Sequence, residues 1–211
     1  ASTPQNGFVP DSFIAENLML LKLIQAYVED EDESAMFLFA DMEKAFDRCS
    51  WQYLKAALAK VGFDDNFIKY VSLFYSHDHP PTRQLSMNGT LGPSFPLHSG
   101  VAQGCPCSPL LFLVVTEALT RLIVNDASIK GVTINGTQHK ISQYADASTL
   151  LPRNVRDWTR MEAHIQTWCD ATAMKENATK IAEGRRRGRP PGVLRRQRPR
   201  HRGVLSLNRL R

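Results

Sequence analysis

Two apolar stretches that each run into an aspartate constrain the fold of this 211-residue chain most. Residues 35–41 read A-M-F-L-F-A-D, which is typical of a buried strand with Asp41 at its C-terminal end. Residues 141–151 read I-S-Q-Y-A-D-A-S-T-L-L, which predicts a strand, a tight turn over 145–147 with Asp146 at its tip, and a second strand. If these strands are neighbours, both carboxylates lie at one edge of a sheet.

The rest of the pattern mixes helices with hairpins. Apolar residues at helical spacing, with capping signals, predict five helices: about 13–29, 51–61 between Ser50 and Gly62, around 67–74, 109–125 and around 158–172. The pairs Asn88-Gly89 and Asn135-Gly136 predict hairpin turns. Because helices and hairpins do not alternate strictly, we expect an α+β fold with an antiparallel sheet rather than a doubly wound one.

Two carboxylates at one sheet edge suggest metal chemistry. Such a pair can hold two Mg²⁺ ions about 3.5–4 Å apart, which lower the pKa of a nucleophile and stabilise a leaving oxygen in phosphoryl transfer. Magnesium needs only one or two carboxylates when substrate phosphates complete its shell. An aspartate in a turn is also a common turn former, so the spacing alone leaves both interpretations of Asp146 open.

Five ordered segments carry the most specific signal in the sequence. They read G-F-V-P-D-S-F-I-A-E-N (7–17), F-A-D-M-E-K-A-F-D (39–47), G-V-A-Q-G-C-P-C-S-P-L-L-F (100–112), I-S-Q-Y-A-D-A-S-T-L-L (141–151) and M-K-E-N-A-T-K (174–180). Each resembles a motif of reverse transcriptases, and the set resembles most those of non-LTR (LINE-like) retrotransposons. The segments occur in the family's order and cover about 7–181.

The resemblance implies the fingers and palm of a right-hand polymerase over residues 1–183, with no recognisable thumb. It implies an RNA-directed DNA polymerase that performs two-metal nucleotidyl transfer with Mg²⁺ or Mn²⁺. Its partners would be an RNA template, a DNA primer and deoxynucleoside triphosphates. Asp41 and Asp146 would be the catalytic metal ligands.

Four further residues acquire roles through the resemblance. Phe46 would lie under the incoming sugar, where an aromatic ring leaves no room for a 2′-hydroxyl. Gln103 and Gly104 would line the nucleotide and template path, and Lys180 would contact the triphosphate or the leaving pyrophosphate. Each of these residues also has a purely structural interpretation. Phe46 could be a core residue, Gln103 a hydrogen-bonded loop amide and Lys180 a solvated cation.

The chain departs from the family pattern at positions that matter for activity. Ala147 stands where the family has the second aspartate of the turn. The other departures replace an arginine at Ser12, an arginine at Ala102 and a leucine at Cys107. Losing the electrostatic stabilisation that the second aspartate would supply at position 147 costs about 10²–10³ in rate. We therefore expect a degenerate or truncated copy whose polymerase activity is impaired.

The C-terminal residues 184–211 differ sharply in composition from the rest. They hold eleven arginines, no lysine and no acidic residue, whereas residues 1–183 hold 15 basic and 21 acidic residues. This composition predicts a tail that does not fold alone and could bind phosphates. The candidate nucleic-acid contacts are Arg185, Arg186, Arg187 and Arg189.

The tail leaves an alternative function open. A non-catalytic remnant could bind nucleic acid through it, and R-G-R-P at 187–190 resembles the core of an AT-hook. A solvated tail or a shifted reading frame explains the same composition.

Little in the sequence points to a membrane or to secretion. The longest apolar run near the middle is 110–115, whereas a spanning helix needs about 20 residues. The N-terminus has no basic and apolar signal-peptide pattern, and the four cysteines lack zinc-site spacing. We expect a nuclear or cytoplasmic chain that is not secreted and has no membrane partner.

Overall fold

The computed structural model describes residues 4–31 and 35–176 and the backbone of 182–184. At its centre is a four-stranded antiparallel sheet. The strand order is β10-β1-β9-β8. The bounds are β1 Phe37–Ala40, β8 Ile141–Tyr144, β9 Ala147–Leu150 and β10 Ala182–Gly184. Strand β9, which follows the Asp146 turn, is therefore the neighbour of β1, and β8, which runs into Asp146, pairs with the other side of β9. The expected antiparallel α+β arrangement is confirmed.

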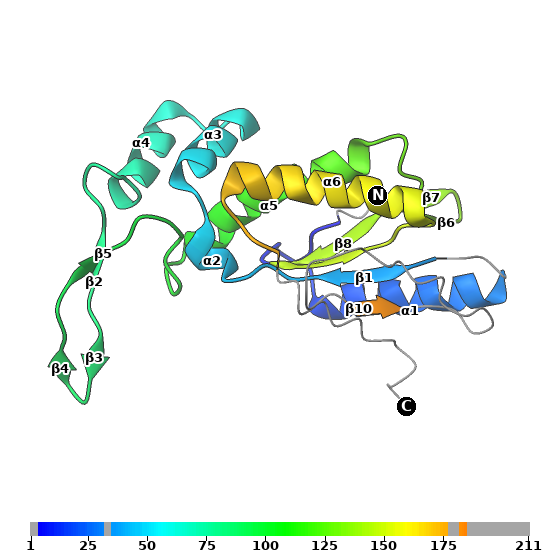
Figure 1. Ribbon diagram of the computed structural model, residues 1–211, viewed down its shortest axis with the longest axis horizontal. Helices are drawn as coiled ribbons and strands as arrows, with labels where there is room; N and C mark the ends of the chain where they lie inside the picture. Colours follow the sequence, from blue (N-terminus) through cyan, green and yellow to red (C-terminus); the bar gives the residue numbers. More distant parts are fainter. Residues whose placement is uncertain (1–3, 32–34, 177–181, 185–211) are drawn as a thin grey trace, which may run out of the picture.

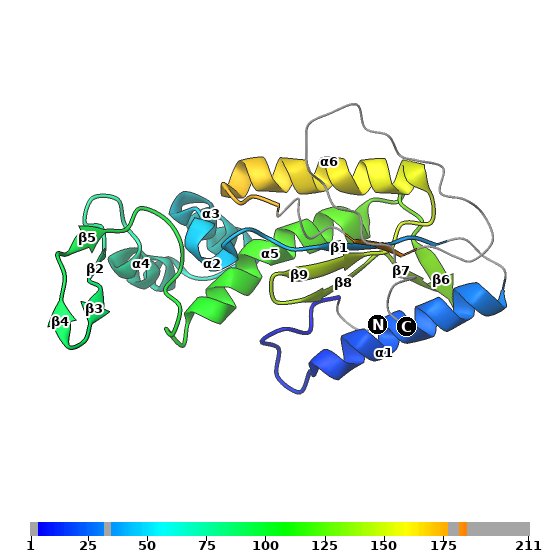
Figure 2. The ribbon, with the colours of Figure 1, turned by 60° about the horizontal axis from the view of Figure 1, so that its bottom comes forward.

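Helices cover both faces of this sheet (Figures 1 and 2). Helix α1 (Ile14–Asp30) packs on one face, and α5 (Ser108–Asn125) with α6 (Val155–Thr172) packs on the other. Side chains along β1 alternate between the two sides, as the pleat requires. Leu38 and Ala40 join the larger core with α5 and α6, whereas Phe37 joins the smaller core with α1.

The remaining elements extend the fold away from the sheet. Helices α2 (Ala45–Arg48), α3 (Trp51–Val61) and α4 (Asp65–Phe74) follow β1. A narrow arm then projects beyond α4 (Figure 1). Its strands are β2 Thr82–Arg83, β3 Ser86–Met87, β4 Thr90–Leu91 and β5 Phe95–Pro96. A separate hairpin, β6 (Val132–Ile134) with β7 (Thr137–His139), precedes β8.

Local sequence signals determine many of the element ends. The Ser50 side chain accepts a hydrogen bond from the Tyr53 N–H and caps α3, which ends at Gly62 with φ +104°. Asn88-Gly89 forms the turn between β3 and β4, with positive φ at both residues. Asn135-Gly136 does the same between β6 and β7. These predicted caps and turns are confirmed.

The turn at Asp146 is shorter than the sequence predicted. Ala147 is the first residue of β9 and pairs with Tyr144, so only Ala145 and Asp146 form the turn. Two residues suffice because Ala145 adopts φ +55°, the sign that a two-residue hairpin requires at its first turn position. Alanine is uncommon in this conformation.

Helix α5 is apolar enough and long enough to cross a membrane by length and composition alone, and it is the one such helix within the described residues. It packs against α3, α6 and β8, and Phe112, Val115, Leu119 and Ile123 are buried in the core. A helix enclosed on several sides is apolar over most of its circumference. We therefore assign α5 as the central core helix.

We expect Leu54→Ala to destabilise the fold, because Leu54 of α3 is fully buried in the larger core. Its loss leaves a cavity and should lower the free energy of unfolding by about 2–5 kcal/mol. Leu73→Ala on α4 is the matched control, because Leu73 is 75% exposed. It should change the unfolding free energy by less than about 0.5 kcal/mol. Urea denaturation measures both, and equal effects would contradict the assigned core.

Candidate active site

Asp41 and Asp146 lie at the ends of paired strands. The register between β1 and β9 pairs Ala40 with Ser148, so its next step sets Asp41 opposite Ala147. Asp146 is the turn residue directly before Ala147, which begins β9. Both Asp41 and Asp146 are half-buried. Strand alternation assigns Asp41 to the same face as Phe39, opposite α5 and α6. The register therefore brings the two candidate acids to one end of the sheet.

The residues after β1 are fixed by the segment at 174–176. Met42 and Glu176 form an antiparallel bridge, and the Glu43 N–H donates to the Lys175 carbonyl at 2.8 Å. The Glu43 carboxylate pairs with Arg48 at 2.8 Å and with Lys175 at 3.3 Å. These hydrogen bonds, first from Arg48 and then from Lys175, lower the pKa of Glu43. Glu43 therefore serves to tie two segments together beside Asp41.

Phe46 stands on α2 with its ring held from two sides. It stacks on Phe112 of α5 with ring centroids 4.7 Å apart and an interplanar angle of 15°. Phe8 meets it edge-on with centroids 6.5 Å apart. The ring is only half-buried, so it combines the predicted core contact with an accessible part. An aromatic side chain held in this way cannot rotate aside easily.

The 99–105 segment is hydrogen-bonded to α2 and to α3. The Val101 N–H donates to the Phe46 carbonyl at 2.7 Å, and the Trp51 indole N–H donates to the Gly100 carbonyl at 2.7 Å. Gln103 and Gly104 follow as exposed residues, and Gly104 has φ +87°. The structure thus brings the Phe46 segment and the predicted template-path loop together.

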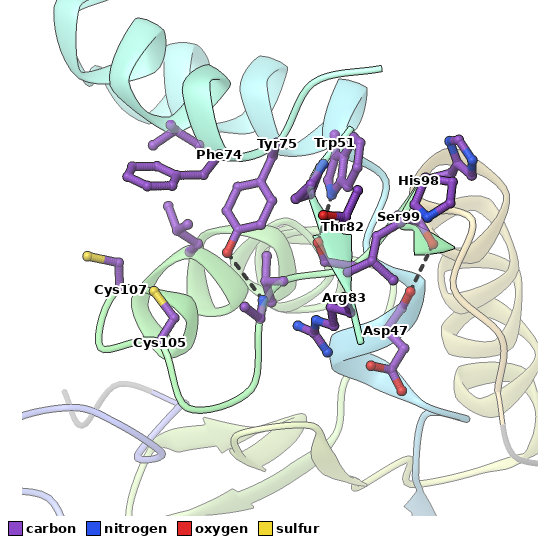
Figure 3. A pocket seen from close by; sticks show the side chains of 18 of the residues that line it. Asp47, Trp51, Phe74, Tyr75, Thr82, Arg83, His98, Ser99, Cys105 and Cys107 are labelled. Carbon is purple, nitrogen blue, oxygen red and sulfur yellow. Dashed lines mark hydrogen bonds between the residues drawn. The ribbon is translucent and has the colours of Figure 1, made fainter. Parts of the chain in front are cut away.

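Behind this loop lies a cavity of about 810 Å³ (Figure 3). Figure 3 shows Trp51 and Tyr75 reaching toward the 99–102 segment, with Asp47 beside Ser99, whose hydroxyl donates to the Asp47 carbonyl at 2.9 Å. The Tyr75 hydroxyl accepts a hydrogen bond from the Ala102 N–H at 3.2 Å. Aromatic and aliphatic side chains from α4 and the arm supply most of the remaining wall. The cavity therefore lies between the loop and the apolar side of α4, and titratable side chains such as Asp47 and His98 lie in its wall.

The donor set at Asp41 and Asp146 fits magnesium better than a softer metal. Within the described part of the chain, no group of three or more His, Cys, Asp or Glu could hold a metal ion. Two carboxylates suit Mg²⁺, which keeps several waters and takes its other ligands from substrate phosphates. Zinc prefers nitrogen and sulfur ligands. The residues present are thus compatible with a divalent ion whose shell a nucleotide completes.

The cysteines belong to two environments. All four are free thiols. Burial raises the pKa of Cys49 to about 12 and that of Cys169 to about 11. A hydrogen bond from the Cys107 backbone lowers the pKa of the partly exposed Cys105. The buried pair, Cys49 and Cys169, packs in the larger core.

Several predicted site residues lie outside the described residues. These are Lys180, Arg185, Arg186, Arg187 and Arg189. Their proposed contacts with the triphosphate or with nucleic acid therefore stay predictions.

The sequence reasoning also missed residues that support the site. Gln5 hydrogen-bonds to the Asp146 turn through its side chain, and Tyr75 holds the 99–102 segment. Tyr75 continues the four-residue spacing of Phe67 and Val71, which predicts burial but not a hydrogen bond to the loop. The one available signal for Gln5 was its position just before the 7–17 motif.

Comparison with known proteins decides the family. The profile described as "Reverse transcriptase (RNA-dependent DNA polymerase)" matches residues 1–193. The chain belongs to the reverse transcriptase family. This confirms the resemblance drawn from the five motifs, and the reverse transcriptase match includes both candidate aspartates.

Two relatives connect this reverse transcriptase to non-LTR retrotransposons. The transposon TX1 uncharacterized 149 kDa protein of Xenopus laevis is 27% identical over 184 residues, or 83% of this chain. The retrovirus-related Pol polyprotein from type-2 retrotransposable element R2DM of Drosophila melanogaster is 29% identical over 126 residues, or 60% of the chain. The chain spans only 13% and 12% of the lengths of these two proteins.

Solved telomerase structures share the fold. Apo telomerase from Candida tropicalis, truncated from the C-terminal domain, has a TM-score of 0.60 at 14% identity, covering 83% of this chain and 36% of that one. Telomerase from Candida albicans, in complex with a TWJ fragment of telomeric RNA, has a TM-score of 0.62 at 11% identity, covering 85% and 32%. At these identities the likeness establishes a reverse transcriptase-like fold.

We expect Gly100→Ala to loosen the contact between the loop and α2. Gly100 has φ +89°, and an added Cβ would lie 2.7 Å from the backbone oxygens of Phe46 and Asp47. Gly62→Ala is the matched control, since Gly62 has φ +104° and open space around its missing Cβ. The control should carry only the strain of positive φ, about 1–2 kcal/mol. Gly100→Ala should lower the unfolding free energy further in thermal denaturation, and equal losses would contradict the close approach.

Proposed function

We propose that the chain is the RNA-directed DNA polymerase portion of a retrotransposon protein, with a weakened active site at Asp41 and Asp146. The pairing of β1 with β9 carries this proposal, because it joins the two acids in a chain of the reverse transcriptase family. In this proposal the sheet with α5 and α6 is the palm. Helices α3 and α4 and the arm contribute to the fingers. The reaction adds a deoxynucleotide to a DNA primer on an RNA template.

Asp41 and Asp146 would hold Mg²⁺ or Mn²⁺ together with the substrate phosphates. When bound, the ions supply positive charge that neutralises the triphosphate and lowers the pKa of the primer hydroxyl. The carboxylates orient this charge because strand ends position them, and structured strands hold side chains better than free loops. The telomerase structure with a TWJ RNA fragment belongs to a protein of the same fold, which supports nucleic acid as the partner.

Phe46 would select the sugar by excluding a 2′-hydroxyl. Its stack on Phe112 keeps the ring in place, so a ribose cannot gain space by displacing it. The hydrogen bond from Val101 to the Phe46 carbonyl links this ring to the loop of Gln103 and Gly104. Those two exposed residues would then contact the nucleotide and template at a fixed distance from the ring.

The replacement of the second aspartate explains why we propose a weakened site. Ala147 is exposed and stands opposite Asp41 in the register. Directly opposite residues have Cβ atoms about 4.5–5.5 Å apart, so a carboxylate at 147 would share an ion with Asp41. Without that carboxylate the site carries one negative charge fewer toward the metal. The expected reduction in rate is about 10²–10³.

We expect Ala147→Asp to increase primer extension by about 10²–10³, because it restores a carboxylate opposite Asp41. Ala147→Asn is the matched control, with the same shape and no charge. Asp41→Asn in the Ala147→Asp background should abolish the gain. Extension of a DNA primer on an RNA template, with Mg²⁺ and then Mn²⁺, measures all three.

The same variants give a readout that does not need activity. Facing carboxylates repel each other, so Ala147→Asp should melt at a lower temperature without divalent ions and recover when Mg²⁺ is added. Ala147→Asn should not respond to Mg²⁺ in this way. If the aspartate and asparagine variants behave alike in both assays, the assignment of this edge as the metal site is wrong.

The basic tail supports a second candidate function, nucleic-acid binding without catalysis. Residues 184–211 hold eleven arginines and no acidic residue. Removing them should greatly reduce the salt dependence of DNA binding if the tail supplies most phosphate contacts, because each contact releases counterions. Binding through the proposed palm would keep its salt dependence. Binding isotherms at several salt concentrations distinguish the two.

A further inference from the structure

The Ala145-Asp146 turn needs support from outside its own hairpin. Ala145 has φ +55°, a conformation that is unfavourable for a residue other than glycine. Strand β8 is also an edge of the sheet, so nothing in the β10-β1-β9-β8 order covers its outer side. A short turn on an edge strand moves easily unless other groups hold it.

The Gln5 side chain holds this turn by its backbone. Its Oε1 accepts hydrogen bonds from the Ala145 N–H at 3.0 Å and from the Gly7 N–H at 2.8 Å. Its Nε2 donates to the Ala145 carbonyl at 3.1 Å. Gln5 is 8% exposed, so these bonds are shielded from water. One amide thus binds both polar backbone groups of the residue that precedes Asp146.

The N-terminal segment around Gln5 also lies along the outer side of β8. Gln5 and Gln143 form a parallel bridge, with the Gln143 N–H donating to the Pro4 carbonyl at 2.7 Å and the Asn6 N–H donating to the Gln143 carbonyl at 3.0 Å. Gly7 then crosses the turn closely, since a Cβ there would lie 2.1 Å from the Ala145 nitrogen. Only glycine permits this approach.

A buried polar network extends the support behind β8. The Gln143 side chain is 1% exposed, hydrogen-bonds to Thr120 of α5 and donates to the Ser148 hydroxyl at 2.9 Å. On the other face the Asn17 amide donates to the Ser142 hydroxyl and to the Gln143 carbonyl, both at 2.9 Å. Satisfied buried networks of this kind specify one arrangement of the strands they join.

We propose that residues 4–7, through the Gln5 amide and the Gly7 contact, position the Asp146 turn for metal binding. The inference rests on the proposed function of Asp146 as a metal ligand. Because Ala147 replaces the second aspartate of the turn, metal binding by the turn depends on the accurate placement of Asp146. When a residue that hydrogen-bonds to a metal ligand and orients it is removed, the metal affinity typically falls about 10–100-fold. Gln5 is therefore a positioning residue, because it acts through the Ala145 backbone.

The test uses the full chain and two matched pairs of variants. Gln5→Leu removes the three hydrogen bonds, and Gln25→Leu on the exposed side of α1 is its control. Gly7→Ala introduces the clash, and Gly92→Ala, whose nearest atom would lie 3.5 Å away, is its control. Two readouts are Mn²⁺ affinity, from the electron paramagnetic resonance signal of free Mn²⁺, and hydrogen–deuterium exchange of residues 141–150.

We expect Gln5→Leu and Gly7→Ala to weaken Mn²⁺ binding about 10–100-fold and to accelerate exchange at 141–150 about fivefold or more. Exchange in α6 should stay unchanged, and both controls should match the parent chain. Faster exchange throughout the chain, or unchanged exchange at 141–150, would overturn the positioning role. If Asp146→Asn leaves Mn²⁺ affinity unaltered, the proposed function fails, whereas the exchange data still decide whether Gln5 holds the turn.

Discussion

The antiparallel pairing of β1 with β9 is the interaction on which the rest of the structure depends. It joins Leu38 to Leu150 and Ala40 to Ser148, residues more than a hundred positions apart in the chain. Closing so long a loop costs conformational entropy, which burial on both faces of the sheet offsets. The larger core with α5 and α6 and the smaller core with α1 supply that burial. Without this pairing, Asp41 and Asp146 would not be held at the same end of the sheet.

Backbone contacts, more than side-chain contacts, hold the candidate site together. Gly100 approaches the Phe46 and Asp47 carbonyls closely, the Val101 N–H binds the Phe46 carbonyl, and Gln5 binds both polar groups of the Ala145 backbone. These contacts act on backbone atoms of the site, and none of them involves the side chain at position 147. The scaffold can therefore stay intact while a residue such as Ala147 replaces a functional one, because Ala147 is exposed and its pairing uses only backbone atoms.

We propose that ancestry and activity separate at Ala147. The profile match over residues 1–193 establishes the reverse transcriptase family. The chain spans about an eighth of the retrotransposon proteins it matches, so their full activities belong to much longer chains. What this chain retains is a sheet edge with two aspartates, an aromatic ring stacked at its side and a loop bound to both α2 and α3. In the proposed site the missing carboxylate would reduce the negative charge at this edge, whereas the pairing of β8 with β9 is kept.

A single sequence was enough to predict the local elements, the family and the candidate acids. The Ser50 cap, the two Asn-Gly turns and the strands that end near Asp41 and Asp146 depend on neighbouring residues, so a single sequence shows them. The folded chain was needed to show that Ala147 pairs within β9, that Phe46 stacks on Phe112 and that Gln5 binds the turn. Those features join distant segments, and their energy comes from burial and hydrogen bonds that no local pattern encodes.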